Sequence, residues 1–361
     1  MENYIQNFHI NYNEELGKGA FGKVYIAIDN NNIKYAAKAI NNEKEGQELL
    51  ANEILNNTEV QNENLVQFFG IKEIDNKFFL IFEYCNGGDL EKNLKQYNEK
   101  YHKNINEQII QKIIKDITNG LSCLHRNHII HHDLKNGNIL VCYETNEDKE
   151  NVNLLKATFK ITDFGLSKKI EISSSPKDEF DTLSQKNSGN ISGTPSYIPP
   201  CLIKILIENL DKDNNIIEND AVDMWSLGIL AYRLLFLKHP FLSKKDEKSS
   251  DSSRKLYLLY NEFKKGYYII DLKDGPVKSV SKEFIIFIDG LLKIKQEFRN
   301  SSEECEYSRF VTRDFSKFHF LNSENCSQEI DKKIIGEDGM LVFDIYDEKK
   351  IKEYKGFIEI A

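Results

Sequence analysis

Residues 129–140, IIHHDLKNGNIL, hold a dense set of side chains that could do chemistry. Asp133, Lys135 and Asn138 occur at short fixed spacing among Ile and Leu residues, and two adjacent histidines, His131 and His132, precede them. Three interpretations are open at this point: a catalytic loop, a metal site, or a helix end with incidental histidines. A zinc site is disfavoured, because the side chains of adjacent histidines diverge and no cysteine or acidic residue completes the spacing of a ligand set.

A glycine-rich segment, LGKGAFGKV at residues 16–24, has the pattern Gly-x-Gly-x-x-Gly. In a dinucleotide-binding fold this pattern follows a strand and opens a helix. Here the following residues, VYIAI, are β-branched and aromatic, so we expect them to form a second strand. A strand–loop–strand order suits a lid whose backbone N–H groups lie over phosphates. The alternative is an ordinary β-turn.

Lys38 lies in a short apolar strand, YAAKAI. A lysine among apolar neighbours is either an edge residue that reaches solvent or a buried cation with a partner. Glu53, on the helix that follows, could be that partner and would keep Lys38 protonated and oriented toward a triphosphate. The alternative is an exposed helix face that carries Glu48 and Glu53.

The elements around these residues change character along the chain. Up to residue 85, alternating apolar runs predict five strands, and helical spacing at residues 45–57 predicts one helix. Beyond this point the pattern is mainly helical, with a long amphipathic helix at 105–127 and a buried apolar helix at 221–237. Stretches rich in Asn, Lys, Ser and Asp are typical of surface insertions; they are residues 143–156, 173–190, 208–220 and 243–255.

Composition limits the possible classes of protein. The 361 residues exceed what one hydrophobic core usually fills, so we expect two lobes. The net charge of −9 argues against non-specific binding to nucleic acid. The six cysteines form no C-x-x-C pair, which argues against zinc and thioredoxin-like sites and suits a reducing compartment. The N-terminal residues do not form a signal peptide, and charges interrupt the most apolar stretch. We therefore expect a soluble, cytoplasmic protein without a membrane span.

Several segments, taken in order, resemble the motifs of eukaryotic protein kinases of the serine/threonine type. HHDLKNGNIL is similar to the catalytic-loop pattern H-R-D-L-K-x-x-N, and ITDFGL is similar to the magnesium-binding Asp-Phe-Gly motif. GTPSYIPP resembles the segment that ends the activation loop, which a small-molecule kinase would not be expected to carry. The helix from Asp223, KHPF at 238–241 and the residues around Arg299 extend the match over about residues 8–315.

The resemblance implies an α+β, two-lobed protein kinase fold. A small N-lobe with a five-stranded sheet and one helix would span residues 1–86, and a larger, mainly helical C-lobe would span 87–315. Residues 316–361 would form a C-terminal extension of unknown role, either a strap on a lobe or a docking element for a partner. The implied activity is ATP-dependent phosphorylation of Ser or Thr hydroxyls in protein substrates. Thr194 and the DLKNGN sequence favour Ser/Thr over Tyr as the acceptor.

The family's functional positions map onto this chain residue by residue. Asp133 would accept or orient the hydroxyl proton as the base, and Lys135 would face the γ-phosphate. Asn138 and Asp163 would hold Mg²⁺ through hard oxygen ligands. The other positions would bind ATP. The glycine loop would lie over the phosphates, and a lysine–glutamate pair would bind the α- and β-phosphates. Backbone groups would contact adenine, apolar side chains would surround the base, and an acid would contact the ribose or the substrate. These residues are Leu16, Gly17, Lys18, Gly19, Ala20, Phe21, Gly22, Lys23, Val24, Ala36, Lys38, Glu53, Glu83, Cys85, Asp89 and Leu140.

Two departures from the family concern regulation. His132 stands where the family commonly has an arginine that binds a phosphate on the activation loop. Asn190 stands where the phosphorylated threonine usually lies. Histidine is mostly neutral at pH 7 and lacks a bidentate fork. The two changes together predict activity that does not depend on that phosphate. His131 is expected to be a packed structural residue, as in the family.

Two further departures concern packing. Cys201 replaces the glutamate that normally pairs with an arginine like Arg299, so either another acid serves Arg299 or the region is rearranged. Asn57 replaces an apolar residue four positions after Glu53, so either an internal apolar column is weakened or Glu48 is the partner of Lys38. None of the four departures removes a phosphoryl-transfer residue, which favours an active enzyme. The alternative is a pseudokinase or scaffold that binds ATP or partners without turnover.

Overall fold

The structure is a computed structural model that describes residues 8–19, 22–40, 47–74, 77–170, 193–208, 219–272, 277–322 and 340–344. Contacts between residues divide the chain into two units. The first unit is residues 1–103 and 136–169, and the second is residues 104–135 and 170–361. These units are groups of contacting residues rather than the expected lobes, and the lobe boundary at residue 86 stays a prediction.

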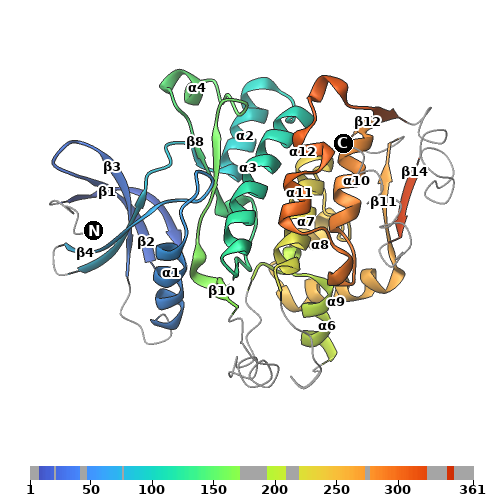
Figure 1. The fold of residues 1–361 in the computed structure, drawn as a ribbon, viewed down its shortest axis with the longest axis horizontal. Helices are drawn as coiled ribbons and strands as arrows, with labels where there is room; N and C mark the ends of the chain where they lie inside the picture. Colours follow the sequence, from blue (N-terminus) through green and yellow to red (C-terminus); the bar gives the residue numbers. More distant parts are fainter. Residues whose placement is uncertain are drawn as a thin grey trace. The chain divides into compact units, whose positions relative to one another are not determined.

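The first unit contains the five-stranded antiparallel sheet and the helix that the sequence predicted (Figure 1). The strand order is β1-β2-β3-β5-β4, so β3 lies at the centre between β2 and β5. The bounds are β1 (His9–Gly19), β2 (Gly22–Ile28), β3 (Lys34–Ala39), α1 (Gln47–Glu59), β4 (Phe68–Ile74) and β5 (Lys77–Glu83).

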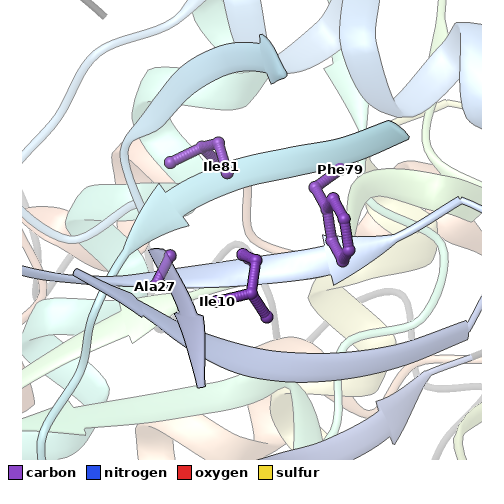
Figure 2. Packing of buried hydrophobic residues seen from close by; sticks show 5 residues of the cluster. Ile10, Ala27, Phe79 and Ile81 are labelled. Atoms are coloured by element: carbon purple, nitrogen blue, oxygen red, sulfur yellow. The ribbon is translucent and has the colours of Figure 1, made fainter. Parts of the chain in front are cut away.

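The sheet buries apolar side chains on both faces, because successive residues of a strand point to opposite sides. Figure 2 shows Ile10, Ala27, Phe79 and Ile81 gathered in the cluster of one face. The alternate residues of β5 pack in a second cluster on the opposite face, which we call the inner cluster. Its buried members are Val66, Leu80, Phe82 and Cys85, and partly buried Ala36, Ile40, Ile54, Phe68, Leu140 and Cys142 pack against it.

A second, three-stranded sheet in the first unit has the order β6-β8-β9. The segment at 143–156, expected to be a polar surface insertion, forms a short capped helix and buries Tyr143, Val152 and Leu154. Most of its other residues are exposed, as expected of a surface insertion, and the three buried apolar side chains anchor the segment. The elements are β6 (Gly88–Asp89), α2 (Leu90–Tyr101), η2 (Asn136–Asn138), β8 (Ile139–Cys142), α4 (Asn146–Glu150), β9 (Thr158–Ile161), η3 (Phe164–Leu166) and β10 (Lys168–Lys169).

The second unit is built around two helices that the sequence predicted. The helix α3 (Glu107–Arg126) begins at Asn106, whose side chain accepts a hydrogen bond from the Ile109 N–H, and it buries one apolar stripe. The helix α7 (Ala221–Phe236) is buried on almost every side, as expected of a helix that is apolar all round.

Shorter elements complete the second unit. Among the described residues of both units, no helix is long and apolar enough to cross a membrane. The elements are β7 (Ile129–Ile130), η4 (Pro195–Tyr197), α6 (Pro200–Glu208), α8 (Lys244–Glu247), α9 (Ser252–Lys265), β11 (Tyr267–Asp271), β12 (Ser279–Ser281), α10 (Lys282–Leu291), η5 (Gln296–Phe298), α11 (Ser302–Glu306), α12 (Arg309–Thr312), η6 (Phe315–Lys317), β13 (Phe320–Asn322) and β14 (Met340–Asp344).

The described part of the C-terminal extension pairs with strands of the second unit. The strand β13 is antiparallel to β12, and β14 is antiparallel to β11. The Phe343 ring stacks on the Tyr268 ring at a centroid distance of 4.9 Å, and both side chains are buried. These contacts favour the strap interpretation for residues 316–322 and 340–344. The rest of the extension lies outside the described residues.

Candidate active site

Lys38 lies in a buried cluster of charges in the first unit. Its Nζ is 2.6 Å from Glu53 Oε1 and 3.4 Å from Asp163 Oδ1. The Lys38 and Glu53 side chains are 8% and 2% exposed, whereas the Asp163 side chain is 32% exposed. Burial raises the pKa of Glu53, and the charge of Lys38 and its hydrogen bond oppose that rise. The arrangement therefore holds the Lys38 cation beside Asp163, the more exposed of the two acids in this cluster.

The position of Lys38 follows from alternation along β3. Ala37 points into the cluster of Figure 2, so Lys38 and Ala36 are the neighbours that point to the other face. Lys38 lies opposite Val24 of β2 and Leu80 of β5 in the sheet register. Residues directly opposite each other in neighbouring strands share a face. Lys38 therefore emerges on the face of the inner cluster.

The helix α1 supplies Glu53 to this face. The next turn carries Asn57, which is buried and donates its side-chain amide to the Glu53 carbonyl at 2.6 Å. The Asn57 amide thus finds a hydrogen-bond acceptor within its own helix and needs no polar partner from another element. The register in which Glu53 pairs with Lys38 is the one that the sequence favoured. The side chain of Glu48 lies outside the described part of the chain.

Residues predicted to surround a base gather on the same face. Ala36 and Leu140 both pack against the inner cluster, which includes Cys85. Val24 lies opposite Lys38 across β2 and β3. The structure therefore brings the expected apolar residues to one side of the sheet, although they come from β2, β3 and β8. Their contact with a nucleotide stays a prediction.

The chain between β5 and β6 carries the expected backbone contacts to adenine. The Glu83 N–H donates to the Gln67 carbonyl at 2.8 Å, and the Cys85 carbonyl accepts from the Gly88 N–H at 3.2 Å. Adenine contacts at these residues would therefore fall on the Glu83 carbonyl and the Cys85 N–H. Asp89 caps α2, because its Oδ1 accepts from the Lys92 N–H at 2.8 Å. A role for Asp89 on the ribose stays a prediction.

The glycine loop joins two strands, as its sequence predicted. Gly17 lies opposite Val24, Lys18 opposite Lys23, and Gly19 opposite Gly22. The φ of Gly22 is 152°, in the region that favours glycine. The chain enters a strand and not a helix, which excludes the dinucleotide-fold interpretation. Of the remaining loop residues, Leu16 lies in β1, while Ala20 and Phe21 lie outside the described residues.

Asn138 and Asp163 are placed by neighbouring turns of the first unit. Asn138 ends η2, is buried, and accepts a backbone hydrogen bond from the Thr162 N–H at 3.0 Å. Asp163 follows directly and has a φ of 69°, a left-handed conformation that costs energy for a residue with a side chain. An amide oxygen and a partly exposed carboxylate are hard oxygen donors, so this donor set fits Mg²⁺.

A buried polar chain anchors the turn that follows Asp163. The Asn56 amide of α1 donates to Ser167 Oγ at 2.7 Å and to the Ser167 carbonyl at 3.3 Å. Ser167 Oγ in turn donates to the Phe164 carbonyl at 2.5 Å. Asn56 and Ser167 are both buried. This contact, which the sequence analysis missed, ties the helix that carries Glu53 to the segment that carries Asp163.

The second unit holds Asp133 and Lys135, the first two residues of the predicted catalytic loop. Asp133 Oδ2 accepts from Lys135 Nζ at 2.6 Å, and Asp133 Oδ1 accepts from Thr194 Oγ1 at 3.0 Å. Lys135 Nζ also donates to Thr194 Oγ1 at 2.9 Å. Each of the three side chains thus contacts the other two. These contacts hold the Asp133 side chain in one orientation beside the Lys135 ammonium group. This arrangement suits a residue that accepts a proton or positions a positive charge.

Asp223 supports this loop from the buried helix α7. It is fully buried and accepts hydrogen bonds from the backbone N–H groups of His131 (2.7 Å) and His132 (2.9 Å) and lies 3.0 Å from Nε2 of His125. Burial opposes its ionisation, but the hydrogen bond and charge of His125 lower the pKa of Asp223. His131 is buried, as expected of a packing residue. The sequence signal for Asp223 was an acid inside an otherwise apolar helix.

Residues 193–200 are held by partners within the second unit. The His239 ring lies 2.8 Å from the Ser196 carbonyl, and burial lowers the pKa of His239 to about 3, so the neutral ring donates this bond. Arg233 contacts the Tyr197 hydroxyl, and Ser226 donates to the Tyr197 carbonyl at 3.0 Å. These contacts with His239, Arg233 and Ser226 therefore hold in place the segment that carries Thr194.

Arg299 finds its partners among backbone carbonyls. Its guanidinium donates to the carbonyls of Lys293, Ala221 and Ile294 at 2.7 to 3.0 Å, and its centre lies 5.2 Å from the Trp225 ring centroid. Burial lowers the pKa of Arg299 to about 10. Cys201 Sγ contacts Gln296 Oε1 at 4.0 Å. Within the described part of the chain Arg299 forms no ion pair with an acid, although the Cys201 thiol and the charge of Glu297 raise its pKa against the effect of burial. Of the two alternatives, a rearranged region is therefore the one that fits.

Comparison with known proteins gives one family. The family model of the protein kinase domain matches residues 10–311. Similar curated proteins are mouse myosin light chain kinase 2, skeletal/cardiac muscle (28% identical, 92% of this chain, 47% of the relative), mouse serine/threonine-protein kinase 33 (29%, 85% and 55%) and the serine/threonine-protein kinase CLA4 of Candida albicans (31%, 85% and 27%). The chain thus spans about half or less of the length of these relatives.

Proposed function

The chain belongs to the protein kinase family, and from that membership we propose that it is an active kinase that transfers the γ-phosphate of ATP to Ser or Thr hydroxyls of protein substrates. The observation that carries the proposal is the mutual contact of Asp133, Lys135 and Thr194. A scaffold has no need of a carboxylate that is buried, oriented and paired with a lysine. The relatives that are named serine/threonine-protein kinases support Ser or Thr as the acceptor.

In this proposal Asp133 acts on the incoming hydroxyl group. Its Oδ1 already accepts a hydrogen bond from the hydroxyl of Thr194, which shows that the carboxylate can bind a hydroxyl in this position. The substrate hydroxyl would take the same kind of bond, and Asp133 would accept its proton as the phosphoryl group is transferred. Lys135 would move from the Asp133 carboxylate toward the transferred phosphate and stabilise its charge.

The first unit would bind the nucleotide. A protein kinase domain uses ATP with Mg²⁺, which neutralises phosphate charge when it is bound. Lys38, oriented by Glu53, would bind the α- and β-phosphates, while Asn138 and Asp163 would hold the metal. Lys38 and Asp163 are 3.4 Å apart, so the cation and the metal ligand would act on neighbouring phosphates.

We further propose that activity does not require a phosphate on the activation loop. His132 replaces the family's phosphate-reading arginine, and its backbone N–H is held by Asp223 at 2.9 Å. The loop therefore has a support that does not involve the side chain at position 132. Asn190, the other half of this argument, lies outside the described residues. Phosphatase-treated protein should retain its activity; protein that is inactive until a residue between 167 and 192 is phosphorylated would contradict the idea.

Transfer of radiolabelled phosphate from ATP to a peptide library tests the main proposal. Asp133→Asn should reduce kcat by about 10²- to 10⁴-fold, the usual contribution of a positioned base, with the affinity for Mg·ADP little changed. The matched control is Asp251→Asn, since Asp251 caps α9 in the same unit and asparagine caps equally well. If the wild-type chain binds Mg·ADP but transfers no phosphate to any peptide or to itself, the pseudokinase alternative holds instead.

A further inference from the structure

Two cysteines of the first unit lie together at the end of the inner cluster. Cys85 is a buried member of that cluster, and partly buried Cys142 packs against it. The thiol of Cys85 donates a hydrogen bond to the Cys142 sulfur, and neither residue is in a disulfide. The two residues lie far apart in the sequence, one after β5 and the other at the end of β8. Their contact is therefore a feature of the fold.

The backbones on either side of the pair are held close together. The Asn86 amide donates to the Tyr143 carbonyl at 2.9 Å, and the Tyr143 N–H donates to Asn86 Oδ1 at 2.8 Å. The Gly87 N–H donates to the Val141 carbonyl at 2.8 Å. A Cβ on Gly87 would lie 2.6 Å from that carbonyl oxygen, so only glycine permits this approach. A disulfide needs Cα atoms within about 7 Å, and contacts at the adjoining positions favour such a separation.

The surroundings of the pair favour a thiolate on Cys142. The hydrogen bond from Cys85 lowers the pKa of Cys142, while burial and the negative charge of Glu83 raise it and the positive charge of Lys160 lowers it; the net effect is a lowered pKa. The same hydrogen bond raises the pKa of Cys85, which keeps its proton. Lys160 is fixed by an ion pair with Glu83 at 2.9 Å. Thiolates react with oxidants whereas thiols do not, and Cys142 is the less buried of the two.

We propose that Cys85 and Cys142 form a reversible disulfide when the protein meets a peroxide. The Cys142 thiolate would attack hydrogen peroxide, breaking the O–O bond, to give a sulfenic acid and, with one proton, a water molecule. The Cys85 sulfur would then attack the Cys142 sulfur, forming the S–S bond and breaking the S–O bond, and the hydroxyl group would leave as water with the Cys85 proton. One peroxide is reduced to two waters, and two thiols are oxidised to one disulfide.

The bond would act on the segment that is proposed to bind adenine, a consequence that rests on the proposed function. Bonded sulfurs are about 2 Å apart, much closer than hydrogen-bonded thiols. Bond formation would draw Cys85 toward β8 and displace the backbone that is expected to contact the base. We therefore expect the oxidised protein to bind Mg·ADP more weakly than the reduced protein, with reduction by dithiothreitol restoring the affinity.

Mass spectrometry of the whole chain, before and after hydrogen peroxide, tests the disulfide without requiring any kinase activity. We expect a loss of two hydrogens and a peptide that joins Cys85 to Cys142, both reversed by dithiothreitol. Cys142→Ser and Cys85→Ala should each abolish the loss. Cys123→Ser should not, since Cys123 is a partly exposed cysteine of the second unit and controls for general oxidation.

Three outcomes would overturn the disulfide: no loss of hydrogens, a bridge to a different cysteine, or oxidation of Cys142 to sulfinic acid with Cys85 unchanged. Isothermal titration with Mg·ADP then tests the consequence on the same samples. A disulfide that forms without changing the affinity would refute the effect on adenine binding alone. A reduced protein that binds no nucleotide would instead count against the proposed function, so the two failures are distinguishable.

Discussion

Replacing Asn56 with leucine should loosen the segment that carries Asp163. The Asn56 amide is buried and donates to Ser167 Oγ and to the Ser167 carbonyl, and Ser167 Oγ donates to the Phe164 carbonyl. Leucine has the branching of asparagine at Cγ but is larger, so the change removes the hydrogen bonds and also tightens the packing, an increase in size that the Asn57→Leu control shares. The two Ser167 acceptors would remain buried and would lose their donor.

The expected size of the effect follows from the cost of unsatisfied buried groups. Leaving a buried acceptor or donor without a partner costs about 1–3 kcal/mol, so Asn56→Leu should lower the free energy of unfolding by that amount. Ser167→Ala should cost a similar amount, because it leaves the Asn56 amide with only the weaker contact at 3.3 Å. In the double variant both partners are gone, so the combined loss should be smaller than the sum by about 1 kcal/mol or more.

Asn57 supplies a matched control on the same helix. It is also buried, but its amide bonds only to the Glu53 carbonyl one turn earlier. Such a bond competes with the helix more than it supports it. Leucine is the better helix former, so Asn57→Leu should change stability by no more than about 0.5 kcal/mol or should stabilise the protein.

Urea unfolding of the full chain, followed by circular dichroism, measures these differences as shifts of the midpoint. Titration with Mg·ADP adds a functional measurement, because a looser turn after Asp163 should weaken binding in Asn56→Leu and not in Asn57→Leu. The reasoning fails if the two leucine variants are equally stable, or if the losses of Asn56→Leu and Ser167→Ala simply add in the double variant.

Two further predictions concern the second unit. Burial raises the pKa of Glu107 from 4.5 to about 7, so between these pH values the folded chain keeps a proton that the unfolded chain releases. The free energy of unfolding should therefore fall by roughly 3 kcal/mol as the pH rises from 4.5 to about 7. The urea midpoints of Glu107→Gln should lack that part of the pH dependence, and midpoints that change with pH in the same way for both proteins would contradict the prediction. Arg299→Met should cost about 3 kcal/mol, because two buried carbonyls and one partly buried carbonyl lose their donor. Cys201→Ser should cost far less, and equal midpoints for these last two variants would show that the carbonyl contacts do not matter.

The parts of the fold that could be read from the sequence are those with a local pattern. The strands β3 and β5 appear in the sequence as short, nearly continuous apolar runs, YAAKAI and KFFLIFE, because each face of the sheet meets an apolar cluster. Lys38 interrupts one such run, so its burial required a partner, and the helical spacing of the next segment placed Glu53 within reach. At these positions the local sequence pattern and the requirement that a buried charge have a partner predicted the same contact.

The contacts that the sequence did not reveal are long-range or involve the backbone. Asn56 and Ser167 are more than a hundred positions apart, and each is an ordinary polar residue in its own segment. Arg299 was expected either to pair with another acid, since a buried charge usually pairs with an opposite one, or to lie in a rearranged region. It is instead satisfied by carbonyl groups, which every residue carries and which no sequence pattern can single out.

Asp223 changes the meaning of the histidine pair at 131 and 132. The φ of His132 is 67°, an uncommon conformation for a residue with a side chain, and the structure must stabilise it. The Asp223 carboxylate does so by accepting the N–H groups of both histidines. The shape of the loop that carries Asp133 is thus set through the backbone by a buried acid. That shape depends on backbone contacts and not on the side chain at position 132, which is why a histidine there is compatible with the proposed activity.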